Sequence, residues 1–264
     1  SMQPVSAYML TFNNAPTVER ALASVAFTDE LVVVDSGSTD GTLELVRAAT
    51  DRVIERPWPG FREQYQFAQN QCSHDWVLFI DADEEISPPL ADEIQTLLGG
   101  VSADDSVRGY NVDRRTFYLG RWILHGAWAR DFEIRLYNRQ HSRWEGGLHA
   151  AVEVDGDVGS LRHFYHHYTH EDIGDQLRTI DRYSTIGAAD LEQQGCRCSL
   201  VRLIGNPLLG FVRDYVLRRG FLDGFPGLVI AVNTAFSTFN KYAKLRERRL
   251  TEDDVRKGFD RKPE

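Results

Sequence analysis

The stretch WVLFIDADEE, residues 76–85, places four carboxylates within five positions directly after an apolar run. An unbroken run of this length, with aromatic and β-branched members, is typical of a strand buried on both faces of a parallel sheet. Ligands of open α/β sheets bind at the carboxyl ends of the strands, so these acids stand where a site is expected. In an extended chain Asp81 and Asp83 would leave the same face, because the side-chain period is two.

Two like charges at a strand end favour a bound cation. Carboxylate oxygens suit Mg²⁺ or Mn²⁺, and Mg²⁺ commonly takes one or two carboxylates together with substrate phosphates. The pair therefore predicts a metal-bound diphosphate, with Asp83 as a metal ligand. Glu84 and Glu85 have a simpler interpretation, since acids ahead of SPPLADEIQTLL favour the N-terminus of the helix that follows.

A second acid, Asp35, ends the apolar run LVVV and is followed by SGSTDGT. Acids at the ends of strands in nucleotide-binding folds accept hydrogen bonds from a ribose or a base. Turn formation is the alternative, because Ser, Thr, Asp and Gly also build tight turns and helix caps.

Strands and helices alternate through the first hundred residues. Apolar runs predict strands at 5–11, 31–35, 52–56 and 76–80, and helical spacing predicts helices that start near Pro16 and cover 42–49 and about 62–72. This alternation indicates βαβ units around a parallel sheet.

The later sequence follows a different pattern. Residues 107–160 read as short strands with aromatic-rich loops inserted over the strand ends, and 172–194 as an amphipathic helix that Gly195 ends. We therefore expect an α/β fold, a Rossmann-type mostly parallel sheet with a C-terminal helical extension. The expected division is a catalytic domain at 1–170 and a helical region at 171–264.

Composition narrows the class of protein. The chain has 264 residues, of which 42% are hydrophobic, and this supports a sizeable core. Its net charge of -9 argues against general nucleic-acid binding. Three cysteines, two of them in a C-R-C spacing too short for an ordinary disulfide or a zinc knuckle, predict a reducing compartment. The N-terminal residues predict no standard export signal.

The C-terminal part is basic, with ten basic residues against three acidic ones between Arg197 and Arg249. Its apolar run from Gly227 to Phe239 is shorter than the roughly 20 residues that a spanning helix needs. Basic flanks around aromatic and apolar residues predict a helix in the membrane interface or in a shallow re-entrant position. A helix packed on the core, with a solvated basic tail, is the alternative.

These motifs resemble a known family. VVVDSGSTDGT followed about forty residues later by DWVLFIDADEE is similar to the inverting family-2 glycosyltransferases with a GT-A-like fold. The segments GRWILHGAW, RDFEIRLYNR, RWEGGLHAAVEVDG and HHYTHEDIGDQLRTIDRYST resemble the lipopolysaccharide-core glucosyltransferase group. The resemblance runs from about Val5 to Lys244 and implies transfer of a sugar, expected to be glucose, from a nucleotide-diphosphate donor, expected to be UDP.

The resemblance also assigns residues to the donor site. It implies that Thr11, Asn13 and Asp35 hold the nucleoside, that Asp81 contacts the ribose side, and that Asp83 binds Mg²⁺ or Mn²⁺ on the diphosphate. Arg135 is expected near phosphate. His167 is expected to be a further ligand of the metal or the diphosphate, although histidines near aromatic rings are commonly structural.

Inverting transfer also needs a general base for the acceptor hydroxyl. Asp131 matches the family's position for it, with Glu133 and Glu145 as alternatives, and an ion pair with Arg130 or Arg135 is the structural interpretation of Asp131. His149 is a candidate contact for acceptor or phosphate.

Two positions depart from the family pattern. Ala150 stands where relatives commonly have Glu after the histidine of GGLHA. Tyr65 and Gln66 stand where many have a basic residue and Asn, so Arg62 is the candidate for a diphosphate contact there.

By resemblance the partners are a nucleotide-sugar donor, a lipid-linked glycan acceptor and the inner-membrane surface, with a cytoplasmic, peripheral location. A polyprenyl-phosphate sugar transferase and a non-catalytic membrane-surface scaffold are the alternatives. A nicotinamide oxidoreductase is disfavoured because TFNNAPT lacks G-x-G-x-x-G after the first strand. A haloacid-type phosphatase is disfavoured because Ser38 stands where its nucleophilic Asp belongs.

Overall fold

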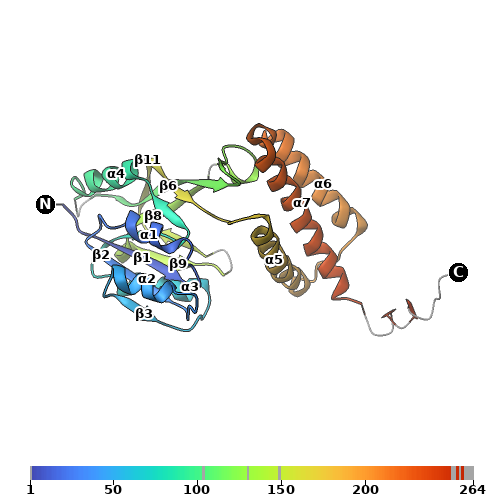
Figure 1. Cartoon of the computed structure of the whole chain (residues 1–264), viewed down its shortest axis with the longest axis horizontal. Coiled ribbons are helices and arrows are strands. Elements are labelled where there is room, and N and C mark those ends of the chain that lie inside the picture. Colours follow the sequence, from blue (N-terminus) through green and yellow to red (C-terminus); the bar gives the residue numbers. More distant parts are fainter. Residues whose placement is uncertain are drawn as a thin grey trace. The chain divides into compact units, whose positions relative to one another are not determined.

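A computed structural model of the chain describes residues 2–102, 105–129, 131–147, 150–250, 254–255 and 257–258. The chain divides into two compact units (Figure 1). The first comprises Ser1–Phe117 and Arg130–Thr169, and the second comprises Tyr118–Ala129 and His170–Glu264.

The first unit begins with the predicted alternation of strands and helices. Its elements in chain order are β1 (Val5–Thr11), α1 (Val18–Ser24), β2 (Glu30–Asp35), α2 (Thr42–Ala49), β3 (Val53–Glu55), α3 (Phe61–Gln71) and β4 (Trp76–Phe79). All four strands are parallel, and the register places Thr11 beside Asp35 and Tyr8 beside Phe79. The carboxyl ends of β1, β2 and β4 therefore meet at one edge of the sheet.

The later strands extend this same sheet, which corrects the expectation of short strands lying over its ends. After β5 (Glu84–Ile86) and α4 (Pro88–Leu98) come the long strands β6 (Val107–Tyr118), β8 (Asp131–Asn138) and β11 (Asp157–His167). The order is β3-β2-β1-β4-β8-β6-β11-β5, with β8 antiparallel to β4 and β6, and β5 antiparallel to β11. Arginines and acids interrupt β6 and β8, so the apolar periodicity that marks a buried strand is broken there.

Smaller elements complete the first unit. The 3-10 turn η2 (Arg139–His141) precedes β9 (Ser142–Glu145), which pairs antiparallel with β10 (Ala151–Val154) in a separate small sheet.

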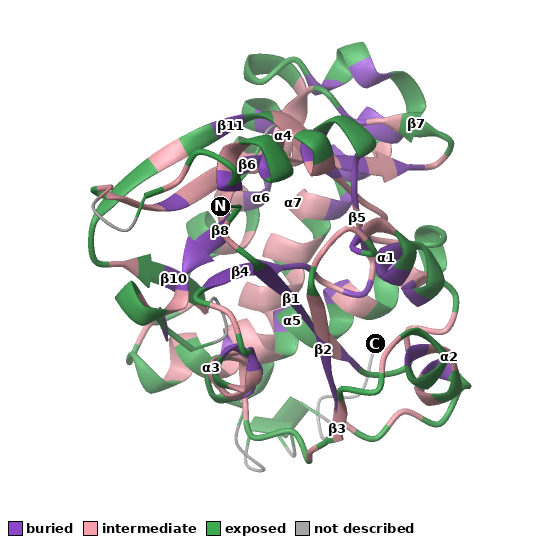
Figure 2. Ribbon diagram, turned by 90° about the vertical axis from the view of Figure 1, so that its left-hand side faces the viewer, coloured by how far each residue is buried: buried purple, intermediate pink, exposed green. Residues whose placement is uncertain are grey.

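The sheet buries side chains on both faces. Ala7 and Met9 of β1 belong to one apolar cluster, to which α1, α2 and α4 contribute, whereas Tyr8 belongs to a second cluster with Ala68 and Cys72 at α3. Figure 2 shows β1 and β4 as buried strands. Strands covered on both faces need the continuous apolar sequence that allowed their prediction.

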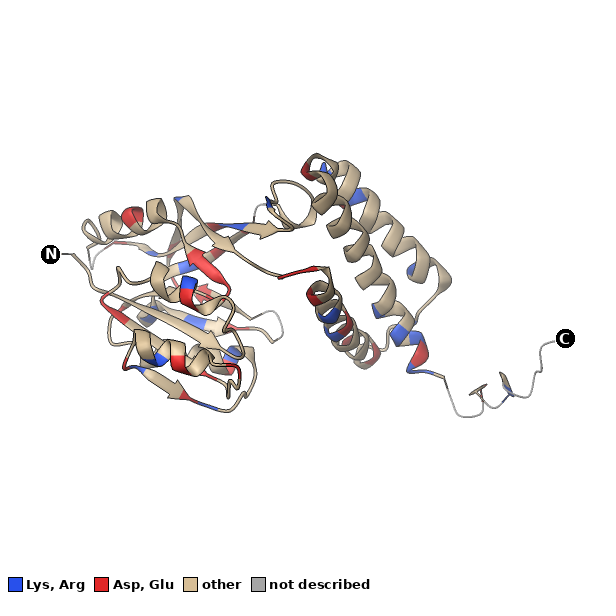
Figure 3. Ribbon diagram, viewed as in Figure 1, with Lys and Arg blue, Asp and Glu red and all other residues tan. Residues whose placement is uncertain are grey.

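The second unit is helical. It contains β7 (Arg121–Trp122), η1 (Gly126–Trp128), α5 (Ile173–Gln193), the π-helix η3 (Val201–Gly205), α6 (Asn206–Phe211), the π-helix η4 (Val212–Leu217), the turn η5 (Gly220–Asp223) and α7 (Gly224–Glu247). The Asp172 side chain accepts a hydrogen bond from the Asp175 amide, and this caps the N-terminus of α5. Helix α7 packs against both α5 and α6, and Figure 3 shows Lys and Arg along α7 and in the helical segments on either side of α6.

The predicted fold class, an α/β fold with a large mostly parallel sheet and a C-terminal helical region, is confirmed. None of the helices in the described part of the chain is long and apolar enough to cross a membrane.

Candidate functional site

Asp35 organises the turn that follows β2. It is fully buried and accepts four hydrogen bonds: from the Thr11 hydroxyl at 2.7 Å, the Ser38 hydroxyl at 2.6 Å, and the amides of Gly37 and Ser38 at 2.9 and 2.8 Å. Burial would raise the pKa of Asp35, but the hydrogen bonds from Ser38, Thr11 and Gly37 lower it below its ordinary value. Asp35 is thus held as a carboxylate that shapes the loop.

Asn13 joins the loop after β1 to the loop after β2. Its amide donates to the Ser38 hydroxyl at 2.9 Å, and its side-chain oxygen accepts from the Thr39 amide at 2.8 Å. Asn13 is exposed, with φ at 54°, whereas Thr11 is buried. The three residues expected at the nucleoside therefore lie in one network, in which Asn13 faces solvent and Thr11 and Asp35 hold the backbone.

Residues 81–84 form a turn, so the expectation that Asp81 and Asp83 leave one face of an extended strand is wrong. The Glu84 amide donates to the Asp81 carbonyl at 3.0 Å, and the Asp81 amide donates to Glu84 Oε2 at 2.9 Å. The Asp81 carboxylate accepts from the Tyr65 hydroxyl at 3.0 Å. Burial, with the charge of Asp83 adding to it, raises the pKa of Asp81 although Arg135 opposes the shift.

Asp83 and His167 lie side by side. Strand β11 pairs with β5 so that His167 is opposite Glu84, and this leaves His167 Nε2 3.4 Å from Asp83 Oδ2. Burial alone would raise the pKa of Asp83, but the hydrogen bond and charge of His167 lower it. Burial likewise opposes charge on His167, yet Asp83 raises the pKa of His167. The lowered pKa of Asp83 and the raised pKa of His167 are both expected of an ion pair between them.

Arg135 is the centre of a buried cluster of charges. Its Nη2 donates to Glu84 Oε1 at 2.9 Å and also to Glu133, and its Nε donates to the Tyr165 hydroxyl at 3.1 Å. Its Nη1 is buried without a hydrogen-bond partner among the described residues, 3.7 Å from Asp81 Oδ2. Burial disfavours charge on Arg135, but the surrounding carboxylates raise its pKa well above the ordinary value.

Glu84 belongs to this cluster and not to a helix N-terminus, which corrects the simpler interpretation of the DEE run. It is 1% exposed and contacts Arg135. Burial raises its pKa to about 8. Glu85 accepts from the Tyr168 hydroxyl at 2.8 Å. The first turn of α4 carries no acid.

Asp131 and Glu133 are joined by Arg114. Arg114 Nη2 donates to Asp131 Oδ2 at 2.5 Å, and its Nη1 lies 3.3 Å from Glu133 Oε1. Asp131 is exposed at the first position of β8. Burial would raise the pKa of Glu133, but Arg135 and Arg114 lower it. Of the alternative partners expected for Asp131, Arg130 lies outside the described residues.

The remaining candidates lie elsewhere or outside the description. Glu145 is on β9 and pairs with Arg143 at 2.7 Å. Arg62, the candidate replacement at the diphosphate, is exposed and pairs with Glu63 at 2.7 Å. His149 lies outside the described residues.

The family departure at Tyr65 has a structural counterpart. The Tyr65 ring stacks on Trp144 with centroids 4.3 Å apart, and its hydroxyl contacts Asp81. Gln66 accepts from the Trp144 amide at 2.9 Å. Tyr65 and Gln66 thus connect α3 to the turn after β4 and to β9.

The donor atoms fit a divalent cation that also binds substrate. Within the described ranges, no group of three or more His, Cys, Asp and Glu side chains is placed to hold a metal. Asp83 and His167 offer one carboxylate and one imidazole, both ligands of Mn²⁺-like ions, and Mg²⁺ sites commonly use few protein ligands beside phosphate oxygens. The residues fit a metal whose coordination is completed by a diphosphate.

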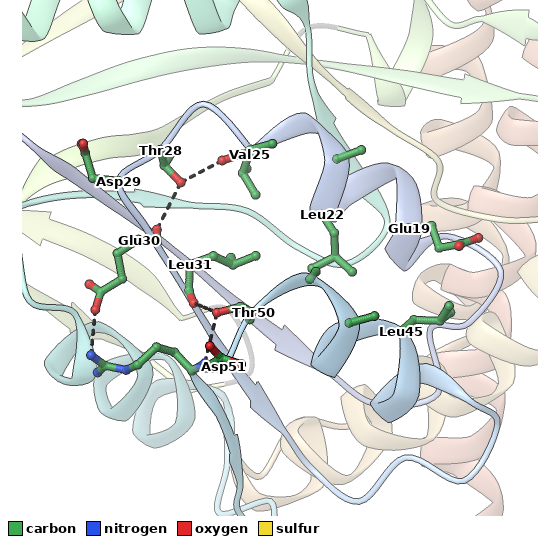
Figure 4. Close-up of a pocket in the computed structure, with 15 residues that line it drawn as sticks. Glu19, Leu22, Val25, Thr28, Asp29, Glu30, Leu31, Leu45, Thr50 and Asp51 are labelled. Carbon is green, nitrogen blue, oxygen red and sulfur yellow. Dashed lines mark hydrogen bonds and ion pairs between the residues drawn. The ribbon is translucent and has the colours of Figure 1, made fainter.

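A pocket of about 780 Å³ lies at the other edge of the sheet (Figure 4). It is lined by the ends of α1 and α2 and the start of β2, with Leu22, Leu31, Leu45 and Thr50 among its residues. It contains none of the predicted site residues, and it lies at the amino end of β2, away from the edge where ligands of such sheets bind.

The fold and the site define an α/β protein whose charged site lies at the carboxyl edge of a mostly parallel sheet, as in nucleotide-binding enzymes. The family described as "Glycosyl transferase family 2" matches residues 6–151. The chain belongs to this family and is a glycosyltransferase.

Relatives support the same assignment. An uncharacterized glycosyltransferase of Rickettsia typhi is 33% identical over 265 residues, which cover 96% of this chain and 90% of that one. The lipopolysaccharide core biosynthesis glycosyltransferase LpsC of Rhizobium meliloti is 30% identical over 255 residues, covering 91% and 93%. The family resemblance drawn from the motifs is confirmed.

A solved structure is similar to part of the chain. Glucosyl-3-phosphoglycerate synthase of Mycobacterium tuberculosis, in complex with Mn²⁺, UDP-glucose and phosphoglyceric acid, is 26% identical and covers 43% of this chain and 44% of that one. Its TM-score is 0.35.

Proposed function

We propose that the protein is an inverting, metal-dependent glycosyltransferase that moves glucose from UDP-glucose to a lipopolysaccharide-core or other lipid-linked glycan. The observation that carries the proposal is the Asp83–His167 pair, 3.4 Å apart, next to the buried Arg135 cluster at the carboxyl edge of the sheet. The relative named for lipopolysaccharide core biosynthesis supports the acceptor class. Family membership favours an enzyme over a non-catalytic scaffold.

The donor would bind across the ends of β1, β2 and β4. Asn13 is exposed for a nucleoside contact, on a loop that Thr11 and Asp35 fix. Asp83 and His167 would hold Mg²⁺ or Mn²⁺, and a divalent cation bound there would stabilise the negative charge of the leaving diphosphate. We propose that residues 1–170 carry these sites.

The chain's own residues would supply the base. The oxygen of the acceptor hydroxyl would bond to the anomeric carbon while Asp131 takes the proton of that hydroxyl. The bond from the anomeric carbon to the diphosphate breaks in the same step, the nucleoside diphosphate leaves, and the configuration is inverted. Asp131 is exposed and pairs with Arg114. Glu133 is the weaker candidate, because Arg135, Arg114 and Tyr165 already engage its oxygens and its pKa is lowered.

Arg135 would act by positioning and not by direct contact with phosphate. It is buried among Glu84, Glu133 and Asp81, so its guanidinium would fix these carboxylates next to the Asp83–His167 pair. The Tyr65 hydroxyl holds Asp81 from the other side.

Calorimetric titration of nucleotides and nucleotide sugars, with and without Mn²⁺, tests the proposal. We expect Mn²⁺-dependent binding of UDP-glucose that Asp83→Ala weakens. Glu85→Ala is the matched control, since Glu85 belongs to the same acidic run but contacts Tyr168. Equal binding by the two variants, or no nucleotide binding by the unaltered protein, would contradict the proposed site.

A lipid-linked acceptor places the enzyme at a membrane surface. We therefore propose a cytoplasmic protein peripherally associated with the inner membrane, and that residues 171–264 carry this association.

A further inference from the structure

Large apolar side chains are exposed along residues 200–225 of the second unit. The six most exposed of them are Leu200, Val201, Leu208, Leu209, Leu217 and Phe225. Leu208 and Leu209, in the middle of the segment, are 61% and 70% exposed. So many exposed apolar side chains within one short segment mark an interaction surface, whereas single exposed ones are ordinary.

The exposed side chains lie on the outer side of one helical segment. Elements η3, α6 and η4 follow each other without a break from Val201 to Leu217. Pro207 and Asp214, seven residues apart, are buried on one face, and Val201, Leu208 and Val212, at helical spacing, are exposed on another. The segment thus has an apolar face turned away from its own unit.

The exposed charged side chains between residues 197 and 225 are all positive. Five arginines between 197 and 225 are exposed: Arg197, Arg202, Arg213, Arg218 and Arg219. The two acids in this range, Asp214 and Asp223, are buried.

Both buried acids already have partners. Asp214 accepts from Arg213 at 2.9 Å and from Arg218 at 3.2 Å. Asp223 accepts from the amides of Leu124 and His125 at 3.0 and 2.7 Å. The outer surface therefore presents arginine and apolar groups together, the combination that suits an anionic membrane interface.

The neighbouring helix α7 is less suited to this task, although it contains the run expected at the membrane. Ile230, Ala231 and Asn233 of α7 are buried, and the Asn233 side chain donates to Gln176 of α5 at 2.6 Å. Lys244 of α7 donates to Asp181 of α5 at 2.6 Å. Beyond its first two residues, which belong to the 200–225 segment, helix α7 is held by α5 and α6, whereas the segment packs against one side of α7 and leaves its own outer face open.

We propose that the 200–225 segment is the membrane-docking element, lying in the interface of an anionic bilayer with its leucines among the acyl chains and its arginines at the headgroups. The inference rests on the proposed function, in which the acceptor is lipid-linked. Pairing of this face with itself in a second copy would set arginines against arginines, which opposes association.

Sedimentation with lipid vesicles tests the proposal on the full chain, without donor or acceptor. Vesicles contain either phosphatidylcholine alone or equal amounts of phosphatidylcholine and phosphatidylglycerol. We expect the protein to bind the anionic vesicles more tightly, with an affinity that falls as salt rises. The double variant Leu208→Ser/Leu209→Ser should bind at least about tenfold more weakly, because it removes inserted apolar surface.

Matched variants distinguish binding through the 200–225 segment from a general effect of exposed apolar or basic residues. Met2→Ser/Val158→Ser changes two exposed apolar residues of the first unit and should bind as the unaltered protein does. Arg202→Gln/Arg219→Gln should lose about fivefold or more in affinity for each arginine on anionic vesicles. Arg47→Gln/Arg143→Gln, two exposed arginines of the first unit, should not.

Several results would overturn the proposal. One is that the unaltered protein binds no vesicles. Another is that Leu208→Ser/Leu209→Ser binds anionic vesicles as tightly as the control variant Met2→Ser/Val158→Ser. A third is concentration-dependent self-association that Leu208→Ser/Leu209→Ser abolishes, which would mean that a second copy covers the face. Calorimetry of Mn²⁺ and UDP-glucose without vesicles keeps the two proposals apart, because its failure would count against the transferase site and not against docking.

Discussion

Replacing Arg135 by Met should destabilise the first unit severely. Arg135 is 2% exposed, and Glu84, its partner at 2.9 Å, is 1% exposed, so at a pH above the Glu84 pKa of about 8 the variant leaves a carboxylate buried without its cation. The guanidinium also lies 4.4 Å from the Phe79 ring centroid and 4.8 Å from that of Tyr165. Removing one partner of such a buried pair costs about 3–5 kcal/mol of unfolding free energy.

Arg143→Met is the matched control. Arg143 also contacts two carboxylates, those of Glu145 and Glu153, both at 2.7 Å, but it is exposed on β9. Exposed pairs of this kind contribute about 0–1 kcal/mol. Hydrogen exchange of peptides from β8, measured in increasing urea, reports the free energy of opening of the first unit for both variants.

A second background tests the physical cause. In Glu84→Gln the buried group is uncharged, so the added cost of Arg135→Met should be smaller than in the unaltered protein. The cost should also shrink as pH falls, because Glu84, whose pKa burial already raises to about 8, takes up a proton and stops being an unpaired charge. Equal costs for Arg135→Met and Arg143→Met, or an unchanged cost in the Glu84→Gln background, would refute the reasoning.

Four further outcomes follow from the site. Thr11→Val removes one of four hydrogen bonds to the buried Asp35 carboxylate and should cost about 1–3 kcal/mol in urea unfolding; a loss near zero would mean that the loop tolerates the change. Mn²⁺ affinity measured by calorimetry should rise with pH through the raised pKa of His167, because the metal competes with the proton there, and His167→Gln should flatten this profile. Without metal, the same raised pKa means that the stabilisation from charged His167 is complete below its unfolded value of about 6.5 and is lost as pH rises through the folded value. Asp131→Asn should lower kcat by about 10²- to 10⁴-fold with little change in donor affinity; a kcat close to that of the unaltered protein would exclude Asp131 as the base.

The βαβ half of the sheet could be predicted because three of its strands, β1, β2 and β4, are buried on both faces. Their sequences are mostly apolar, and each ends at a recognisable polar turn, as at Asp35. Strands β6 and β8 could not be recognised at full length, because Arg114, Glu133 and Arg135 interrupt them. Those charges are tolerated in strands because they pair with one another, Arg114 with Glu133 between β6 and β8 and Arg135 with Glu133 within β8.

The candidate site could be predicted as a set of residues but not as a set of contacts. Asp83 and His167 were each expected from the sequence near the metal, and the structure places them together; their role as ligands stays a prediction. The Arg135–Glu84 contact joins residues 51 positions apart and depends on the order of β4, β8 and β5 in the sheet. No local pattern encodes that order, so the sequence around Glu84 indicates only an acid ahead of a helix N-terminus and not the contact with Arg135.

The turn after β4 explains why consecutive acids serve different purposes. Asp81 accepts a hydrogen bond from Tyr65 and pairs with Arg135, Asp83 pairs with His167, and Glu84 pairs with Arg135. With Glu133 and Asp131, five carboxylates surround two arginines and one histidine.

That excess of negative charge is consistent with the raised pKa values of Asp81 and Glu84, to which burial contributes most and neighbouring carboxylates add. A divalent cation at Asp83 and His167 would offset the excess and lower both pKa values, so binding should release protons. The heat of Mn²⁺ binding should therefore change with the ionisation enthalpy of the buffer. A heat independent of the buffer would mean that binding releases no protons, so that both acids are already ionised and His167 is already neutral before the metal binds.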